Sequence, residues 1–126
     1  MQQFRLIFIL FAIMLTACCG GSKSTTGTVV APGGGTTNNV ILGSRSYILA
    51  LPAGFEADKA YKLLLAFHGS SGSSAGMQQL AGFERLSGDY ILAYPQSEQI
   101  DWNEGCGCNI AHRLGADDLG FVDQVI

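Results

Sequence analysis

The chain has 126 residues, with 10 acidic and 7 basic side chains and a formal net charge of −3 at neutral pH. A mildly acidic chain has no electrostatic basis for binding nucleic acid or an anionic lipid surface, which excludes those two classes of partner. Apolar residues make up 48% of the sequence although it also holds 17 glycines. Most of that apolar excess comes from the N-terminus.

The first 17 residues have the organisation of an export signal. A short segment with one positive charge, Arg5, precedes an apolar run over residues 6–15. The run is too short to cross a bilayer core and has the length of a signal-peptide core. A cysteine directly after Leu15-Thr16-Ala17 resembles the lipobox of bacterial lipoproteins, in which the thiol of the cysteine, here Cys18, is acylated before cleavage. The alternative is an ordinary secretory signal followed by a chance cysteine.

We therefore predict that residues 1–17 are removed and that the mature protein is exported and anchored by lipid on Cys18. Each buried methylene of an acyl chain contributes about 0.8 kcal/mol, so two or more chains anchor stably. The protein would face the periplasm or the exterior from the cell membrane or, since Cys19 and not Asp follows, the outer membrane. The low-complexity remainder of residues 18–39 predicts a disordered tether.

Residues 40–126 predict alternating strands and helices. The expected elements are strands over 40–42 and 45–51, a strand over 62–67, a helix over 77–86, a strand over 90–94, an irregular segment over 96–114 and a helix over 116–126. Gly43 suits a hairpin between the first two strands. The nearly continuous apolar run at 62–67, which only Lys62 interrupts, is typical of a strand covered on both faces.

This order predicts an α/β fold, a β-hairpin followed by a parallel βαβα unit. A complete α/β domain is seldom so small, so we expect residues 40–126 to be the first part of a larger domain.

The junction His68-Gly69-Ser70 carries the chemical interpretation. It directly follows a predicted strand, where α/β-hydrolases place a loop whose backbone N–H helps to bind the oxyanion formed during ester cleavage. The Ser70 N–H would be that donor, with His68 and Gly69 shaping the loop. A structural role for a buried His68 at a strand end is the equal alternative.

Several short motifs occur in a specific order over about two thirds of the chain. They are Arg45-Ser46-Tyr47, Leu51-Pro52-Ala53-Gly54-Phe55, Leu65-Ala66-Phe67-His68-Gly69, Ala93-Tyr94-Pro95-Gln96, Trp102-Asn103-Glu104-Gly105 and Asp117-Asp118-Leu119-Gly120-Phe121-Val122. Together they resemble the polyhydroxybutyrate depolymerase and feruloyl esterase family of secreted α/β-hydrolases. The resemblance implies a serine carboxylic-ester hydrolase without a cofactor, acting on polyester or plant-phenolic esters.

The resemblance also implies that the catalytic serine, acid and histidine come after the last residue of this sequence. The chain does contain a match to the G-x-S-x-G nucleophile motif at residues 72–76, with Ser74 in the nucleophile position and Asp101 and His112 following in the triad order. We discount this match because the nucleophile must follow a strand directly, and residues 68–71 intervene. We therefore expect this chain to lack the triad and to be inactive alone.

Cys106 and Cys108 are candidates for structural disulfides. Pairing with each other looks strained for residues two apart, and pairing with a cysteine outside this sequence suits an exported protein better. No metal site is expected, because His112 alone does not complete one with the two cysteines. In the resembling family a pair of cysteines often follows the Trp-Asn-x-Gly segment.

Trp102 is expected in the core or as a pocket wall, and Asp117 and Asp118 as charges at a helix start. Two functions follow for the chain. The first is the N-terminal part of a lipid-anchored ester hydrolase with a small-molecule or polymer ester as substrate. The second is a non-catalytic surface lipoprotein that binds a partner on a partial hydrolase scaffold.

Overall fold

A computed structural model describes residues 29–30, 35–86 and 88–126. Its elements in chain order are β1 (Val29–Val30), β2 (Thr36–Leu42), β3 (Arg45–Leu51), β4 (Lys62–Leu65), α1 (Ser74–Ala81), the short 3-10 helix η1 (Phe83–Arg85), β5 (Tyr90–Pro95), α2 (Ile110–Arg113) and α3 (Asp118–Val125). The predicted signal peptide, Cys18 and most of the predicted tether lie outside the described residues. Among the helices that are described, none is long and apolar enough to cross a membrane.

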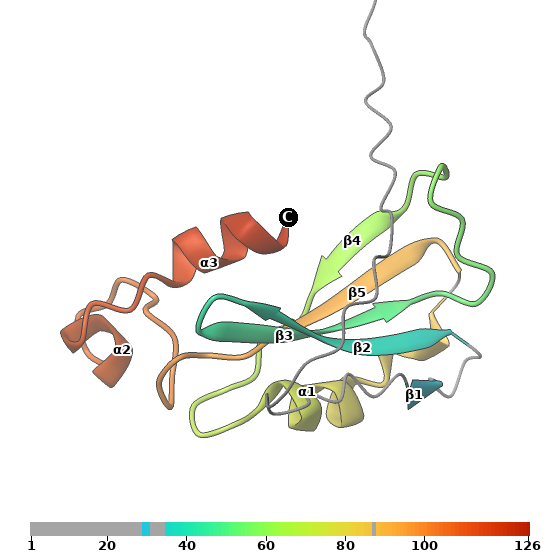
Figure 1. Cartoon of the computed structure of the whole chain (residues 1–126). Coiled ribbons are helices and arrows are strands. Elements are labelled where there is room, and N and C mark those ends of the chain that lie inside the picture. The colour runs from blue at the N-terminus through green and yellow to red at the C-terminus, as the bar shows by residue number, and fades with distance from the viewer. Residues whose placement is uncertain (1–28, 31–34, 87) are drawn as a thin grey trace, which may run out of the picture.

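The strands form one mixed sheet in the order β1-β2-β3-β5-β4 (Figure 1). The pairs β1–β2, β2–β3 and β3–β5 are antiparallel, and β4 runs parallel to β5. The predicted hairpin is present as β2 and β3, which are joined by Gly43 and Ser44. Gly43 has a φ of +60°, and a left-handed residue at the first position of a two-residue turn is the type II′ geometry that glycine favours. The mixed sheet and the helices between and after its strands confirm the predicted α/β class.

The prediction that the tether extends to Asn39 was wrong. β2 begins at Thr36, and its register pairs Thr36 with Leu51 and Asn39 with Ile48. β1 adds a further pair of residues on the outer side of β2. Residues 36–39 are polar, so no apolar pattern in the sequence indicated a strand there. The backbone of β3 offers hydrogen-bonding groups along its whole length, so β2 pairs with β3 beyond the apolar residues 40–42.

The segment from β4 through α1 to β5 is the parallel unit that the sequence predicts. α1 begins at Ser74, three residues earlier than expected, because the Ser73 side chain accepts a hydrogen bond from the Gly76 N–H and caps the helix. Gly82 ends α1 in the left-handed conformation, with a φ of +57°.

The apolar layer lies between α1 and the sheet. It consists of the buried residues Ala50, Ala66, Leu92 and Tyr94, with Ile48, Leu64, Met77, Ala81, Phe83 and Tyr90 packed around them. The members from β3 and β5 alternate along their strands, as expected when one face of a sheet is buried.

β4 is an edge strand in the described part of the chain, and one of its faces is partly exposed, which corrects the expectation of a strand covered on both faces. β5 returns from α1 into the place between β3 and β4, so β4 has a strand on one side only. Leu63, whose side chain alternates with the inward-facing Leu64, is 41% exposed.

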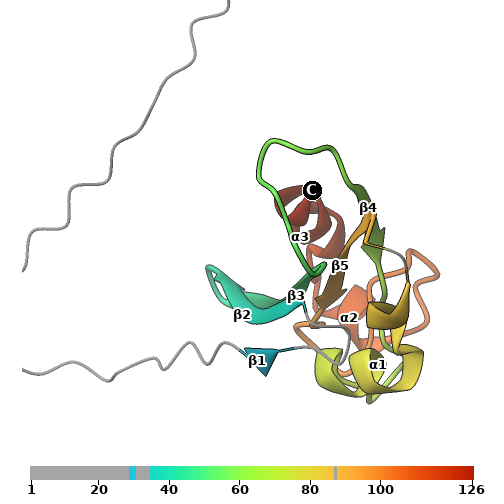
Figure 2. The same cartoon turned by 90° about the vertical axis from the view of Figure 1, so that its right-hand side faces the viewer.

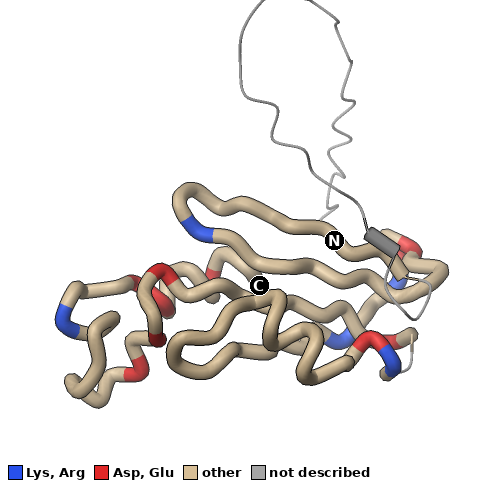
Figure 3. Tube along the Cα trace, turned by 90° about the horizontal axis from the view of Figure 1, so that it is seen from below, with Lys and Arg blue, Asp and Glu red and all other residues tan. Residues whose placement is uncertain are grey.

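α3 lies on the opposite side of the sheet from α1 (Figures 1 and 2). Its Phe121 packs under the guanidinium of Arg45, with 4.1 Å between the Arg45 Cζ and the ring centre. The segment between β5 and α3 was predicted to be irregular and contains the one-turn helix α2. Charged residues are concentrated in the loops at the two ends of the sheet, and few lie along the strands (Figure 3).

Candidate functional site

His68 lies buried, only 4% exposed, in the loop that follows β4. Its Nε2 accepts hydrogen bonds from the Ser97 N–H and from the Gln96 Nε2, each at 3.2 Å. Its Nδ1 lies 2.8 Å from the Gly69 carbonyl oxygen and donates to it. This pattern assigns the neutral tautomer with the proton on Nδ1. Both ring nitrogens are therefore occupied, and His68 joins the loop after β4 to the loop after β5.

Gln96 is the second member of this junction. Its side-chain Oε1 accepts from the Ser74 N–H at 2.9 Å, at the start of α1. Its own N–H donates to the Ser46 carbonyl and its carbonyl accepts from the Arg45 guanidinium. The motif at 93–96 was recognised in the sequence, but no role was predicted for Gln96. A polar residue that directly follows a buried strand ending in proline is the feature that could have indicated this role.

Trp102 holds the same loop from the other side. Its indole N–H donates to the His68 carbonyl at 2.8 Å, and its ring meets the Phe67 ring edge-on with 5.0 Å between centres. The indole thus fixes the backbone on which Ser70 is carried. A pocket-wall role for Trp102 stays a prediction.

The loop turns sharply between Gly69 and Gly72. The Gly72 N–H donates to the Gly69 carbonyl at 3.0 Å, and Ser71 adopts a φ of +60°. A left-handed third residue is the type II turn pattern. The Ser71 N–H donates to the Ile100 carbonyl at 2.6 Å, which ties the tip of the turn to the segment after β5.

Ser70 is exposed at the first central position of this turn. No hydrogen bond within residues 35–86 and 88–126 uses its backbone N–H. The neighbouring residues are held by His68, Trp102 and Ile100, so the Ser70 N–H is a fixed donor that is open to solvent. An oxyanion-binding donor needs this combination of rigidity and availability.

A buried ion pair stabilises the segment that carries Trp102. The Arg45 guanidinium lies 2.7 Å from the Asp118 carboxylate, and the two side chains are 9% and 8% exposed. The second carboxylate oxygen of Asp118 accepts from the Asn103 N–H, and the Asn103 side chain donates to the Ala116 carbonyl. The expectation that Asp118 is a charge at a helix start was incomplete, because Asp118 begins α3 but its partner is Arg45. Asp117 is the N-cap of α3, where its carboxylate accepts from the Gly120 N–H.

The residues of the discounted nucleophile motif do not form a triad. Ser74 is the first residue of α1, and the whole loop 66–73 separates it from β4. The Asp101 carboxylate accepts from the backbone N–H groups of Ile110 and Ala111 at the start of α2. His112 is exposed, and its Nδ1 bonds to Asn103.

Cys106 and Cys108 are bonded to each other, with 5.3 Å between their Cα atoms. The preference for partners outside this sequence was wrong. The Cα separation lies within the ordinary range for a disulfide, and Gly107, with a φ of +71°, lets the chain turn tightly enough to bring the two side chains together. Both cysteines and the neighbouring Glu104 are exposed.

Comparison of the chain with family models, with curated proteins and with solved structures gave no match. The candidate site therefore rests on the geometry described above. The motifs at Arg45, His68, Gln96, Trp102 and Asp118, which are far apart in the sequence, are neighbours in one network of contacts.

Proposed function

We propose that the chain is the N-terminal part of an exported, lipid-anchored carboxylic-ester hydrolase of the serine type. In this proposal the Ser70 N–H donates to the oxyanion of the tetrahedral intermediate. The nucleophilic serine, the histidine base and the acid come from sequence beyond Ile126. The observation that carries the proposal is a backbone donor without a partner among the described residues, in the loop after β4, on a backbone held by three separate contacts.

The contacts explain how a backbone donor could stabilise a transition state. An N–H group aimed in advance at the developing negative charge does not need to reorganise during the reaction. The buried His68 holds the loop to Gln96 and Ser97, and the Trp102 indole holds the His68 carbonyl. In this role His68 is a positioning residue and not a base, because its Nε2 already accepts two hydrogen bonds.

The surroundings of the loop suit a substrate-binding end of an α/β sheet. Ligands of such sheets bind outside the carboxyl ends of the parallel strands, and the Ser70 loop follows the carboxyl end of β4. The Phe67 side chain beside it is 41% exposed. An apolar surface next to an oxyanion donor fits an ester with an apolar acyl or aromatic group, as in polyesters and phenolic esters.

The decisive test compares two substitutions at one position. Proline is favoured at the first central position of this kind of turn, so Ser70→Pro removes the N–H while keeping the turn. In the reading frame continued past Ile126, Ser70→Pro should lower kcat on a small activated ester by roughly 10²–10³-fold. Ser70→Ala keeps the N–H and should keep the activity. Equal kcat values for the proline and alanine variants would contradict the oxyanion role.

The same reading frame separates the enzyme from the non-catalytic alternative. A continuation into a strand and a G-x-S-x-G motif supports the hydrolase. A stop codon directly after Ile126 favours a surface lipoprotein that binds a partner. The 126-residue chain alone should not hydrolyse the ester, and hydrolysis that Ser74→Ala abolishes would restore Ser74 as a nucleophile.

A further inference from the structure

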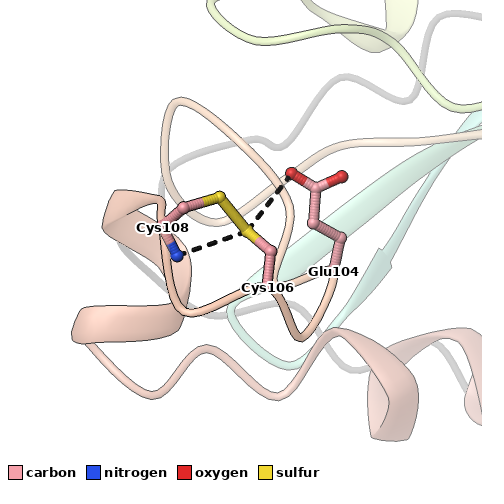
Figure 4. A group of neighbouring side chains, drawn as sticks. All are labelled: Glu104, Cys106 and Cys108. Atoms are coloured by element: carbon pink, nitrogen blue, oxygen red, sulfur yellow. Dashed lines mark hydrogen bonds between the residues drawn. A yellow bond between two sulfur atoms is a disulfide. The ribbon is translucent and has the colours of Figure 1, made fainter.

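The loop 104–108 gathers several side chains that can bind a metal ion. The Glu104 carboxylate and the two sulfurs lie within 4.8 Å of one another (Figure 4). The Glu104 Oε1 lies 3.9 Å from the Cys106 sulfur, and the Cys108 N–H donates to that sulfur at 3.2 Å. All three residues are exposed, so the group is accessible from solvent.

His112 lies against the same loop. Its Nε2 is 3.7 Å from the position that a Cβ would occupy on Gly107, between the two cysteines. The Asn103 side-chain nitrogen donates to the Ala116 carbonyl, so the Asn103 oxygen faces the His112 Nδ1 at 3.1 Å as an acceptor. His112 therefore carries its proton on Nδ1, and its Nε2 lone pair is on the side of the cysteine loop.

Asparagine side chains orient both of the non-sulfur groups. Asn109 donates to the Trp102 carbonyl at 2.6 Å and to the Glu104 carboxylate at 3.2 Å. Asn103 orients His112 in the same way. Metal ligands in proteins are commonly held by such a second layer of hydrogen bonds, which fixes their direction before the ion binds.

We propose that this loop is a redox-gated zinc site, in which Cys106, Cys108, Glu104 and His112 bind Zn²⁺ once the disulfide is reduced. Two thiolates, an imidazole and a carboxylate are all accepted zinc ligands, and four of them make a tetrahedral site. While the disulfide is intact, the two sulfurs are bonded to each other, so the site lacks its two thiolate ligands.

The chemistry of opening balances with a dithiol as reductant. The dithiol gives two electrons and two protons to the disulfide, the bond between the two sulfurs breaks, and the dithiol becomes a disulfide itself. Zinc then replaces the two thiol protons. A disulfide between two exposed cysteines is open to attack by a thiolate, and one that spans only three residues constrains the unfolded chain little.

The backbone allows the change in sulfur separation. Two sulfurs around a tetrahedral zinc ion stand about 3.8 Å apart, given a Zn–S distance of about 2.3 Å, so the two thiolates move apart once the disulfide is reduced. This movement needs only side-chain rotation and small movements of the loop. Gly105 and Gly107, with φ values of +77° and +71°, supply that freedom.

Zinc titration of the full chain in both redox states tests the proposal. A phosphine reductant opens the disulfide, and Co²⁺ serves as a probe because thiolate ligation gives it a charge-transfer absorption. The reduced chain should bind one ion with that absorption, and the oxidised chain should not. The Cys106→Ser/Cys108→Ser variant measures any binding by Cys18 and Cys19, and it should lack the site.

The two remaining ligands are tested singly in the reduced chain. Glu104→Gln and His112→Ala should each weaken zinc binding by roughly tenfold or more. Unchanged affinity in both variants would overturn the four-ligand site. Binding by the double serine variant as tight as that of the parent chain would overturn it as well. So would a disulfide that the phosphine reduces only after the chain is unfolded in guanidinium.

Discussion

Two regions of the described protein are packed with opposite chemistry. The apolar layer of Ala50, Ala66, Leu92 and Tyr94 joins α1 to the sheet by hydrophobic contact. The polar network at the other region consists of Arg45, His68, Gln96, Trp102, Asn103 and Asp118, which are joined by hydrogen bonds and one ion pair. The first region makes the fold, and the second places the Ser70 loop.

The two regions should respond differently to substitution. Burial of apolar surface contributes in proportion to area, so trimming a side chain there removes part of the stability. In a buried polar network each missing partner leaves another group without a hydrogen bond, and that group then bears its full cost of desolvation. The polar network should therefore be the more sensitive region.

Asp118→Ala is expected to have the largest effect. Removal of the carboxylate leaves the buried Arg45 guanidinium unpaired and the Asn103 N–H without its acceptor. Loss of one partner from a buried ion pair costs about 3–5 kcal/mol in the free energy of unfolding, which urea denaturation measures. Asp117→Ala, at the exposed cap of the same helix, should cost about 1 kcal/mol.

Replacing both Arg45 and Asp118 with apolar residues tests whether the unpaired charge causes the loss of stability. Arg45→Met combined with Asp118→Leu should cost less than Asp118→Ala alone, since no charge then stays buried without a partner. A double variant that is less stable than the single one would show that Arg45 acts mainly through its contact with Phe121 and not through its charge.

His68→Ala is the next largest expected effect. It leaves the Ser97 N–H and the Gln96 side chain without their acceptor and opens a cavity below the Ser70 loop. We expect a loss of about 2–3 kcal/mol in the free energy of unfolding. His112→Ala is the matched control on an exposed histidine and should change stability by at most about 0.5 kcal/mol. Equal losses at the two positions would contradict the structural role of His68.

The apolar layer was largely predictable from the sequence, and the polar network was not. The apolar runs at 63–67 and 90–94 predict the two strands that supply Leu64, Ala66, Leu92 and Tyr94 to this layer, although Leu63 and Phe67 of the first run are each 41% exposed. The contact of Arg45 with Asp118 joins residues 73 positions apart. No local sequence pattern indicates that Arg45 and Asp118 form an ion pair, so the sequence predicted Asp118 only as a charge at a helix start.

The loop that carries Cys106 and Cys108 is a second case in which the sequence could not predict a contact. The spacing of Cys106 and Cys108 argued against a bond between them, but the decision depends on the backbone at Gly107. A φ of +71° is a conformation that glycine permits and that composition does not reveal. The grouping of Glu104 and His112 around the cysteines also depends on α2, which the sequence did not predict.

Tyr94→Phe should give the smallest effect and the opposite sign, because it improves the apolar layer. The Tyr94 hydroxyl is buried, and no described residue lies in good hydrogen-bonding geometry to it, although the Glu84 carboxylate and the Phe83 backbone are close by. Removing it should raise the free energy of unfolding by about 1 kcal/mol at neutral pH. Burial raises the pKa of the Tyr94 phenol above its ordinary value of about 10, and the negative charge of Glu84 raises that pKa further.

The raised pKa adds a dependence on alkaline pH. Below pH 10 the phenol is neutral in both the folded and the unfolded chain, so its contribution to stability is fully present. Above pH 10 the unfolded chain loses this proton and the folded chain keeps it, so stability falls by up to about 1.4 kcal/mol per pH unit from this group. Urea denaturation between pH 8 and pH 11 should show a shallower fall for Tyr94→Phe, while Tyr90→Phe on the same strand keeps the steeper one. A Tyr94→Phe protein that is less stable at pH 7 would mean that the hydroxyl has a partner after all, and that the apolar layer, like the polar network, depends on a hydrogen bond.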